Sequence, residues 1–316
     1  MATYTLRRIG QLVLVLVGVS ILTFALLALI PGDPAQAILG SYATPKNLAD
    51  LRAQMHLDQP LVNQYVAWMG HALTGNLGVS YSLDRPVVGV VLGRLGATLL
   101  LAAAAFVVCV LLGLFSGLVA SFWHGRWQDR LTTVTALVGL STPTFWLAML
   151  LVLVFSVSLG WFPSSGMVSP YGGGSLADRL RHLLLPALAL GLVASGVIAR
   201  ITRSSMLDVL GEDYLRTARA KGLAERTVVL KHAFKNGLVA IVPVIGVQVG
   251  FLLGGAVYIE TIFDWPGIGS MLVTAIQKRD ILLVQGGVLV VAVAYALINL
   301  AADLVQALID PRIRVR

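Results

Sequence analysis

Residues 97–120 read ATLLLAAAAFVVCVLLGLFSGLVA, and this stretch decides the fold. Its 24 residues include no Asp, Glu, Lys or Arg. About 20 consecutive apolar residues in a helix are enough to cross the hydrocarbon core of a bilayer. The stretch is therefore predicted to be a transmembrane helix, and the rest of the chain repeats its pattern.

Five further stretches are long and apolar enough to span a membrane. They cover residues 9–30, 132–160, 183–201, 238–259 and 283–309. Together with residues 97–120 they predict an all-α integral membrane protein with about six transmembrane helices. Pro143 follows Ser141-Thr142 inside one of them, and proline removes a backbone donor from a helix. A kink or break is predicted at that point.

Composition agrees with a membrane protein. Apolar residues make up 57% of the chain and charged residues only 12%, whereas soluble chains average about 25% charge. The net charge of +8 does not indicate nucleic-acid binding, because the basic residues lie between apolar stretches and no nucleic-acid motif is present. Cys109 is the single cysteine, so no intramolecular disulfide can form.

The distribution of Lys and Arg predicts the orientation. With a cytoplasmic N-terminus, 15 of them fall in inside segments and 8 in outside segments. Basic residues favour the cytoplasmic side, so both termini are predicted to be cytoplasmic. A signal peptide ending near Ala35-Gln36-Ala37 is the alternative for the first stretch. Its apolar run of about 22 residues exceeds the 7–15 of a signal peptide, and it is predicted to stay attached.

The predicted outer segment, residues 31–96, contains two helix starts. Thr44-Pro45 and Asp58-Gln59-Pro60 each place proline at the beginning of a helix. After the second start, apolar residues recur at helical spacing until Thr74-Gly75-Asn76; they are Leu61, Tyr65, Trp68, Met69 and Ala72. This helix is predicted to cap the outer face of the bundle, and a docking surface for an extracytoplasmic partner is the alternative.

The chain carries no recognisable catalytic machinery. The phosphate-binding pattern G-x-x-x-x-G-K-[ST] is absent, and the dipeptide Gly-Lys does not occur at all. The five His are scattered without metal-ligand spacing, and no Ser lies in G-x-S-x-G. The chain is therefore predicted not to be an enzyme and to hold no metal. If the chain carries out uphill transport, the energy must come from an ion gradient or from another polypeptide.

Ionisable residues inside the spans bear on the ion gradient. Ion-coupled carriers usually hold such groups deep in the membrane. Here Glu260 lies at the end of a span, and Asp303 lies about two turns from one. Asn299 and Asp303 share a helix face, either as a structural polar contact or as a gating or proton-relay pair.

Small residues recur at helical spacing in two spans. Gly246, Gly250 and Gly254 repeat every four residues in one, and Gly191 and Ser195 do so in another. Such stripes allow helix backbones to approach closely. They predict helix packing and assembly and indicate no substrate.

The predicted cytoplasmic loop 202–237 is the most informative segment. It contains seven Lys or Arg and four acidic residues among apolar ones. Residues 213–222 predict a short helix stopped by Gly222, and a second short helix follows at about 224–234. The hairpin fits either a groove on a cytoplasmic protein or a basic face on anionic lipid, and composition leaves both open.

The same loop carries a family resemblance. Residues 213–237, DYLRTARAKGLAERTVVLKHAFKNG, resemble the coupling loop of binding-protein-dependent ABC importer permeases. Counting back from Gly222 places Arg216-Thr217-Ala218 where the general family has Glu-Ala-Ala. The sequence R-T-A-x-A-K-G is similar to the peptide and nickel branch of that superfamily.

Other motifs extend the resemblance from about residue 7 to 314 and point to the B-type permease subunit. They are PGDP at 31–34, LDQPL at 57–61, GNLG at 75–78, RLGATL at 94–99, ETIFDWPGIG at 260–269, Arg279-Asp280 and DPRIR at 310–314. Two positions depart from the family pattern. Gly96 replaces a usual proline, which is expected to soften the entry to the second span, and Asn76 replaces a common aspartate.

The resemblance implies the ABC importer permease fold in a bacterial inner membrane, with a cytoplasmic coupling-helix loop. The residues implied to contact an ATPase are Asp213, Tyr214, Leu215, Arg216, Thr217, Ala218, Ala220, Lys221, Gly222 and Leu223. The first transmembrane helix and the outer helical segment would form residues 1–96. A five-helix core with the coupling loop at 202–237 would form residues 97–316.

The resemblance also implies partners and a cargo. The partners are a second permease subunit, two ATP-binding subunits that hold ATP and Mg²⁺, and an extracytoplasmic binding protein. This chain itself would hold no cofactor, and its substrate-binding residues are not identified. The cargo would be a di- or oligopeptide, with nickel or another small solute as the alternative. An ion-coupled secondary carrier is a further alternative; it would require an internal repeat, which the sequence does not show.

Overall fold

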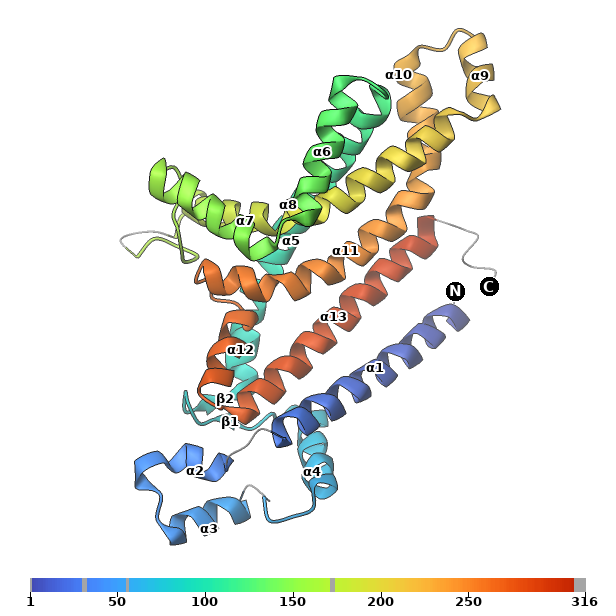
Figure 1. Ribbon diagram of the computed structural model, residues 1–316. Coiled ribbons are helices and arrows are strands. Elements are labelled where there is room, and N and C mark those ends of the chain that lie inside the picture. Colours follow the sequence, from blue (N-terminus) through green and yellow to red (C-terminus); the bar gives the residue numbers. More distant parts are fainter. Residues whose placement is uncertain (1, 30–32, 55–56, 171–173, 310–316) are drawn as a thin grey trace. The chain divides into compact units, whose positions relative to one another are not determined.

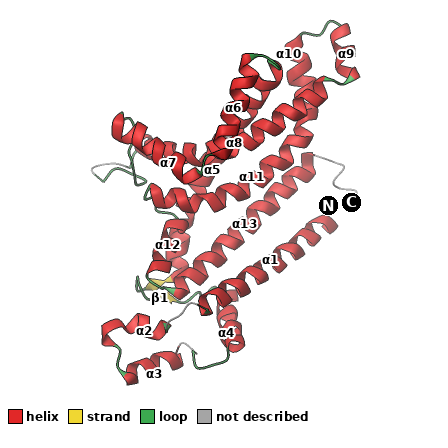
Figure 2. Ribbon diagram, in the orientation of Figure 1, coloured by secondary structure: helices red, strands yellow, loops and turns green. Residues whose placement is uncertain are grey.

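A computed structural model describes residues 2–29, 33–54, 57–170 and 174–309. Positions 31–32 of the PGDP motif and the DPRIR motif at 310–314 lie outside the described residues. Loops and one short strand pair connect the helices of the described chain (Figure 2). It divides into two compact units, Met1–Ala97 with Pro266–Leu297, and Thr98–Trp265 with Ile298–Arg316.

Five helical segments of the described chain are long and apolar enough to cross a membrane, and Figure 1 labels their helices. They lie in α1 (Ala2–Ala28), α5 (Val87–Phe122), α8 (Leu176–Leu210), α11 (Phe234–Ile262) and α13 (Ile281–Ile309). The corresponding five predictions are confirmed. However, α5 begins ten residues before the predicted start at 97, so Gly96 lies inside the helix and not at its entry.

The remaining predicted span is sharply bent. Helix α6 (Trp127–Ser141) is followed by α7 (Thr144–Leu151) and a π-helical segment η2 (Val152–Ser158), at an angle of 107°. Thr142 and Pro143 between them have extended backbone. The predicted break at Pro143 is confirmed. The pair counts either as a sixth, broken span or as a re-entrant segment.

The first unit contains short helices after α1. They are α2 (Pro34–Leu39), the 3₁₀ turn η1 (Gly40–Tyr42), α3 (Pro45–Gln54) and α4 (Leu61–Leu73). The hydroxyl of Thr44 accepts a hydrogen bond of 3.2 Å from the amide of Asn47 and so caps α3. Both predicted helix starts are confirmed, and so is the end of α4 before Gly75, whose φ of 84° suits glycine.

Helix α4 packs against α1 through aromatic rings. Tyr65 and Trp68 lie 5.5 and 6.3 Å from Phe24, measured between ring centroids. The hydroxyls of Tyr65 and Ser20 are 2.9 Å apart. This aromatic face is therefore used inside the unit, and both the capping and the docking interpretation stay predictions. Val62, Val66 and other large apolar residues of α4 remain exposed.

The buried carboxylate of Asp280 joins the strand pair to the connection between the last two helices. Strands β1 (Val79–Ser80) and β2 (Arg85–Pro86) pair antiparallel, and α12 (Ile268–Gln277) precedes α13. Asp280, between these two helices, is fully buried and accepts hydrogen bonds from the Ser80 hydroxyl at 2.6 Å and the Ser82 amide at 3.1 Å. It also accepts a hydrogen bond of 3.2 Å from the Leu283 amide, as a helix-capping residue does.

Replacing this carboxylate is expected to loosen the strand pair. Asp280→Ala would remove the short acceptor of the buried Ser80 hydroxyl and the acceptor of the Leu283 amide, at a cost of about 2–4 kcal/mol. Thermal unfolding in detergent measures the effect, with Asp50→Ala at an exposed position of α3 as control. Equal stability of the two variants would contradict the anchoring role.

Tyr81 strengthens the same contact by donating its hydroxyl to the carbonyl of Lys278 at 2.7 Å. Burial and the charge of Asp280 raise the pKa of Tyr81 to about 12, against a smaller lowering by Arg279. The unfolded phenol titrates near 10, so its contribution to stability is complete below about pH 10 and is lost as pH rises toward 12.

The second unit is built on close approach of α8 to its neighbours. A Cβ added at Gly117 of α5 would lie 2.5 Å from the Cβ of Thr202 and 2.6 Å from the carbonyl oxygen of Ala199. One added at Gly191 would lie 2.6 Å from the carbonyl oxygen of Ala105. The predicted role of Gly191 in close packing is confirmed.

Two glycines of the stripe on α11, Gly246 and Gly254, make no close contact within the described chain. A Cβ at Gly246 would make only an ordinary contact with Ala302 at 3.8 Å, and one at Gly254 would meet no described atom within 4 Å. The tight position is the neighbouring Gly255, 2.9 Å from Leu190. Gly255 packs within the chain, and a role of the Gly246, Gly250 and Gly254 face in assembly stays a prediction.

Candidate functional site

The chain between α8 and α11 forms a helical hairpin (Figure 1). Helix α8 ends at Leu210, and the amides of Gly211 and Glu212 bond back to its last turn. Helix α9 (Asp213–Ala220) is the first arm, and α10 (Glu225–Thr227) begins the second. The predicted short helix at 213–222 is therefore confirmed.

Gly222 ends the first arm with left-handed backbone, φ 78°. Its amide donates to the carbonyl of Arg219 at 2.9 Å, and the Leu223 amide donates to that of Ala218 at 3.4 Å. These two bonds form the Schellman pattern that closes a helix on a glycine. The predicted glycine stop is confirmed.

The second arm differs from its prediction. The chain from Glu225 continues through a π-helical segment, η3 (Val228–Ala233), into α11 without a break, as one helix of 38 residues. The predicted separate helix ending near 234 is wrong. Gly237 does not end it, because this residue is buried against Met206 and Ser205 inside the continuing helix. The second arm of the hairpin is therefore continuous with a candidate membrane-spanning helix.

A small apolar cluster holds the first arm in place. It consists of Met206 from α8, Leu215 from α9, and Val228, Val229 and Ala233 from η3. All five are buried, and Leu118 of α5 packs against them. Burying a leucine side chain contributes about 1.5–3 kcal/mol. Leu215 is the only fully buried residue of α9 in the described chain, so it fixes the helix against η3.

The ten residues implied to couple thus separate into an anchor and a surface. Leu215 is buried and Ala218 half-buried. The other eight are exposed; they are Asp213, Tyr214, Arg216, Thr217, Ala220, Lys221, Gly222 and Leu223. The exposed set mixes charged, polar and apolar side chains.

Two polar contacts stiffen the hairpin, and the sequence pattern did not predict either. Arg219 donates two hydrogen bonds to the carboxylate of Glu225, at 2.8 and 3.0 Å, across the glycine turn. These bonds and the charge of Glu225 raise the pKa of Arg219 above its ordinary value. The side chain of Asn236 donates to the hydroxyl of Tyr214 at 2.6 Å. Partners 22 residues apart leave no local signal in the sequence.

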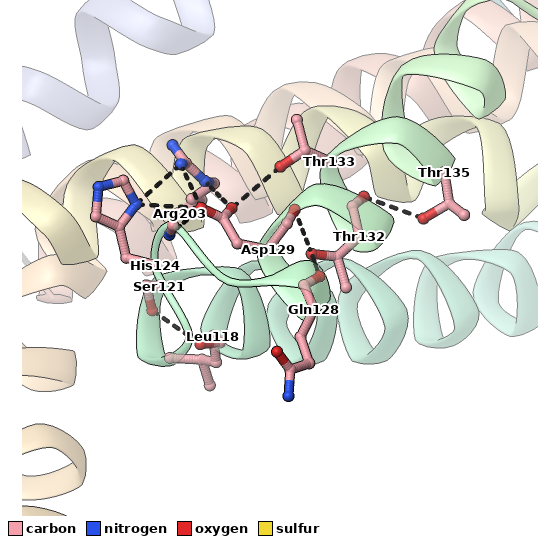
Figure 3. A network of polar contacts seen from close by, with 10 residues as sticks. Leu118, Ser121, His124, Gln128, Asp129, Thr132, Thr133, Thr135 and Arg203 are labelled. Atoms are coloured by element: carbon pink, nitrogen blue, oxygen red, sulfur yellow. Dashed lines mark hydrogen bonds and ion pairs between the residues drawn. The ribbon is translucent and has the colours of Figure 1, made fainter.

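A second polar network lies where α5 and α6 meet α8, and Figure 3 shows it. Asp129 is buried and accepts hydrogen bonds from Nε and Nη2 of Arg203 at 2.6 and 2.9 Å. The amide of Gly125 donates to the same carboxylate at 3.0 Å, and Nδ1 of His124 lies 3.1 Å from it. The sequence indicated Arg203 only as one of the basic residues of the loop. In the structure it is the hydrogen-bonding partner of Asp129.

The predicted ionisable residues of the spans occupy different surroundings. Glu260 lies near the end of α11 and is fully buried. Its carboxylate accepts a hydrogen bond of 2.6 Å from the Thr98 hydroxyl. Asn299 and Asp303 are half-buried in α13, and a gating role for them stays a prediction. Among the described residues no group of three or more His, Cys, Asp or Glu side chains is placed to hold a metal ion.

Models of one protein family match nearly the whole chain. Residues 109–315 match the model for the binding-protein-dependent transport system inner membrane component. Residues 1–102 match the model for the N-terminal part of the same membrane component. The chain belongs to this permease family. The permease is thus a multi-pass inner membrane protein, and the predicted boundary between residues 96 and 97 stays a prediction.

Relatives match the permease over its whole length. It is 41% identical to the dipeptide transport system permease protein DppB of Alkalihalophilus pseudofirmus, over 99% of this chain and 100% of the relative. It is 42% identical to the glutathione transport system permease protein GsiC of Escherichia coli O6:H1, over 100% of both chains. The resemblance to the peptide branch is confirmed.

Solved structures share the fold. The MetNI methionine ABC transporter in an inward-facing conformation matches with a TM-score of 0.55 at 16% identity, over 70% of this chain and 96% of that one. An amino acid ABC transporter matches with a TM-score of 0.52, also at 16% identity, over 71% and 94%. The permease therefore has the ABC importer permease fold.

Proposed function

We propose that the permease is the membrane subunit of an ATP-driven importer of di- and oligopeptides. A second permease subunit, two ATP-binding subunits and an extracytoplasmic binding protein would complete the assembly. Full-length identity of 41–42% to a dipeptide and a glutathione permease carries this proposal. The chain supplies the path and the coupling surface, and ATP and Mg²⁺ belong to the partner subunits.

Transport by reconstituted vesicles tests the cargo. Vesicles that contain the permease and its partners, with binding protein outside, are expected to accumulate labelled dipeptide only when ATP is available to the ATP-binding subunits. Uptake driven by an ion gradient without those subunits would support the secondary carrier and contradict the proposal. Accumulation of Ni²⁺ in place of peptide would refute the peptide cargo while leaving the coupling mechanism intact.

The α9–Gly222–α10 hairpin supports the coupling part of the proposal. Eight exposed residues form its surface, and Leu215 attaches that surface to η3 and so to α11. A rigid knob continuous with a spanning helix can transmit the closure of an ATP-binding subunit to the membrane. The same continuity has no use in a basic loop that only rests on lipid.

Substitution of Gly222 is expected to weaken coupling. A β-branched residue in left-handed backbone costs about 1–2 kcal/mol or more, and no neighbouring atom limits the space. Gly222→Val should therefore distort the Schellman turn and reduce ATP hydrolysis stimulated by loaded binding protein. Gly222→Asn is the matched control, because asparagine tolerates this backbone. Unchanged stimulation in the valine variant, with the ATP-binding subunits still attached, would argue against the hairpin as coupling element.

We also propose that both termini are cytoplasmic, with α6, α7 and η2 crossing as one broken span. The distribution of Lys and Arg, 15 against 8, supports this orientation. Single cysteines at exposed positions in a Cys109→Ala background test it. Lys46→Cys and Ser164→Cys should react with an impermeant thiol reagent from outside, and Arg226→Cys should not. If Arg226→Cys reacts from outside while Ser164→Cys does not, the bent pair is re-entrant.

A further inference from the structure

The turn between α5 and α6, residues 122–130, has a surface that the proposed function does not use. Three large aromatic side chains are exposed there: Phe122 by 42%, Trp123 by 39% and Trp127 by 68%. The turn follows directly on an apolar helix of 36 residues and begins another helix. Trp at the end of an apolar span is typical of the boundary between hydrocarbon and headgroups.

The charge of this surface is positive. Arg126 and Arg130 are exposed. Asp129 is the only acidic residue of the turn, but it is buried and engaged by Arg203, as Figure 3 shows. The carboxylate is thus removed from the surface, and two guanidinium groups remain beside exposed indole rings. This combination attracts the anionic headgroup layer of a membrane.

The turn is also held rigidly enough to present these groups. Gly125 has left-handed backbone, φ 77°, and its amide donates to Asp129 at 3.0 Å. Arg203 bonds the same carboxylate through two nitrogens, which ties the turn to α8. The backbone that carries Arg126 and Arg130 is thus held in place, which lowers the cost of ordering the turn when a ligand binds.

From these observations we propose that residues 122–130 bind the headgroup of an anionic phospholipid. Arg126 and Arg130 pair with its phosphate groups, while Trp123 and Trp127 lie in the interfacial layer. The site lies close to the apolar cluster of the hairpin. Leu118 packs against that cluster, and it precedes Phe122 by one turn of α5. Bound anionic lipid is therefore expected to support ATP-driven activity, a consequence that rests on the proposed coupling role of the hairpin.

Lipid retention by the purified complex tests the site. Native mass spectrometry would count phosphatidylglycerol molecules that remain bound after exchange into detergent with phosphatidylglycerol and phosphatidylcholine. The double variant Arg126→Gln/Arg130→Gln is expected to bind phosphatidylglycerol about 30-fold more weakly, from about tenfold per 1.4 kcal/mol and about 1 kcal/mol per basic group. The matched control, Arg179→Gln/Arg181→Gln, removes two exposed charges near the start of α8 and should retain lipid.

Three results would overturn the proposal. The first is equal retention of phosphatidylglycerol by the double variant and the unaltered complex. The second is an equal loss in the control, which would reduce the effect to overall charge. The third is loss of the ATP-binding subunits with lipid retention unchanged, which would make the turn a protein contact. Lipid retention does not depend on transport, so it tests this site even if the proposed peptide cargo is wrong.

Discussion

Gly117→Val is expected to prevent α5 and α8 from packing and to reduce the yield of folded permease sharply. Even a Cβ would lie 2.6 Å from the carbonyl oxygen of Ala199 and 2.5 Å from the Cβ of Thr202. Backbone cannot rotate away as a flexible side chain can, so one helix would have to shift along its length. Overpacking a core typically costs about 1–3 kcal/mol, and a clash with backbone is expected at or above the upper end.

The measurement is thermal unfolding of the purified protein in detergent, together with the fraction that remains monodisperse. Gly93→Val is the matched control, because it adds the same side chain to the same helix at an exposed position with no described atom within 4 Å. If the two variants are equally stable, close packing at Gly117 is not what holds α5 to α8.

Leu215→Ala is expected to detach α9 from η3 and to abolish coupled ATP hydrolysis. Leu215 is completely buried among Met206, Val228 and Val229, and truncating a buried leucine costs about 2–5 kcal/mol. The hairpin has few other buried contacts, so the loss should open the hairpin locally without unfolding the spans. At 3 kcal/mol the open population rises by about two orders of magnitude.

A reporter cysteine measures this opening directly. Val229→Cys is buried beneath α9, and in a Cys109→Ala background its labelling rate follows the open population. Leu223→Ala is the control, since it makes the same change at an exposed position of the same hairpin. Fast labelling is expected only with Leu215→Ala. Labelling that stays slow while activity falls would show that Leu215 acts in another way than by anchoring.

The spans and caps follow from local sequence, for a physical reason. A stretch such as residues 97–120 has no stable place outside lipid, and a helix is the structure that satisfies its backbone there. Thr44-Pro45, Pro143 and Gly222 act through their own backbone preferences, so each marked a boundary that the structure confirms. The family was likewise readable, because its motifs are runs of adjacent residues.

Continuity of the helix after Ala224 required tertiary structure. Glycine usually weakens a helix, yet Gly237 lies inside one, where α8 packs closely against it and leaves little room for a side chain. The same reasoning applies to the stripe at Gly246 and Gly254. Spacing of four residues locates a helix face, but only the neighbouring helix decides whether that face is the packed one.

The role of charged residues also depended on tertiary contacts. In the sequence, Asp129, Arg203 and Arg126 are charged residues near the ends of predicted spans, with no sign of their partners. Folding buries Asp129 against Arg203, 74 residues away, and leaves Arg126 exposed. In the same way Leu215 became an anchor while Tyr214 beside it stayed on the surface. The sequence alone determined which segments lie in the membrane and which family they form. Tertiary structure decided which side chains hold the hairpin and which face outward, because burial depends on residues distant in the chain.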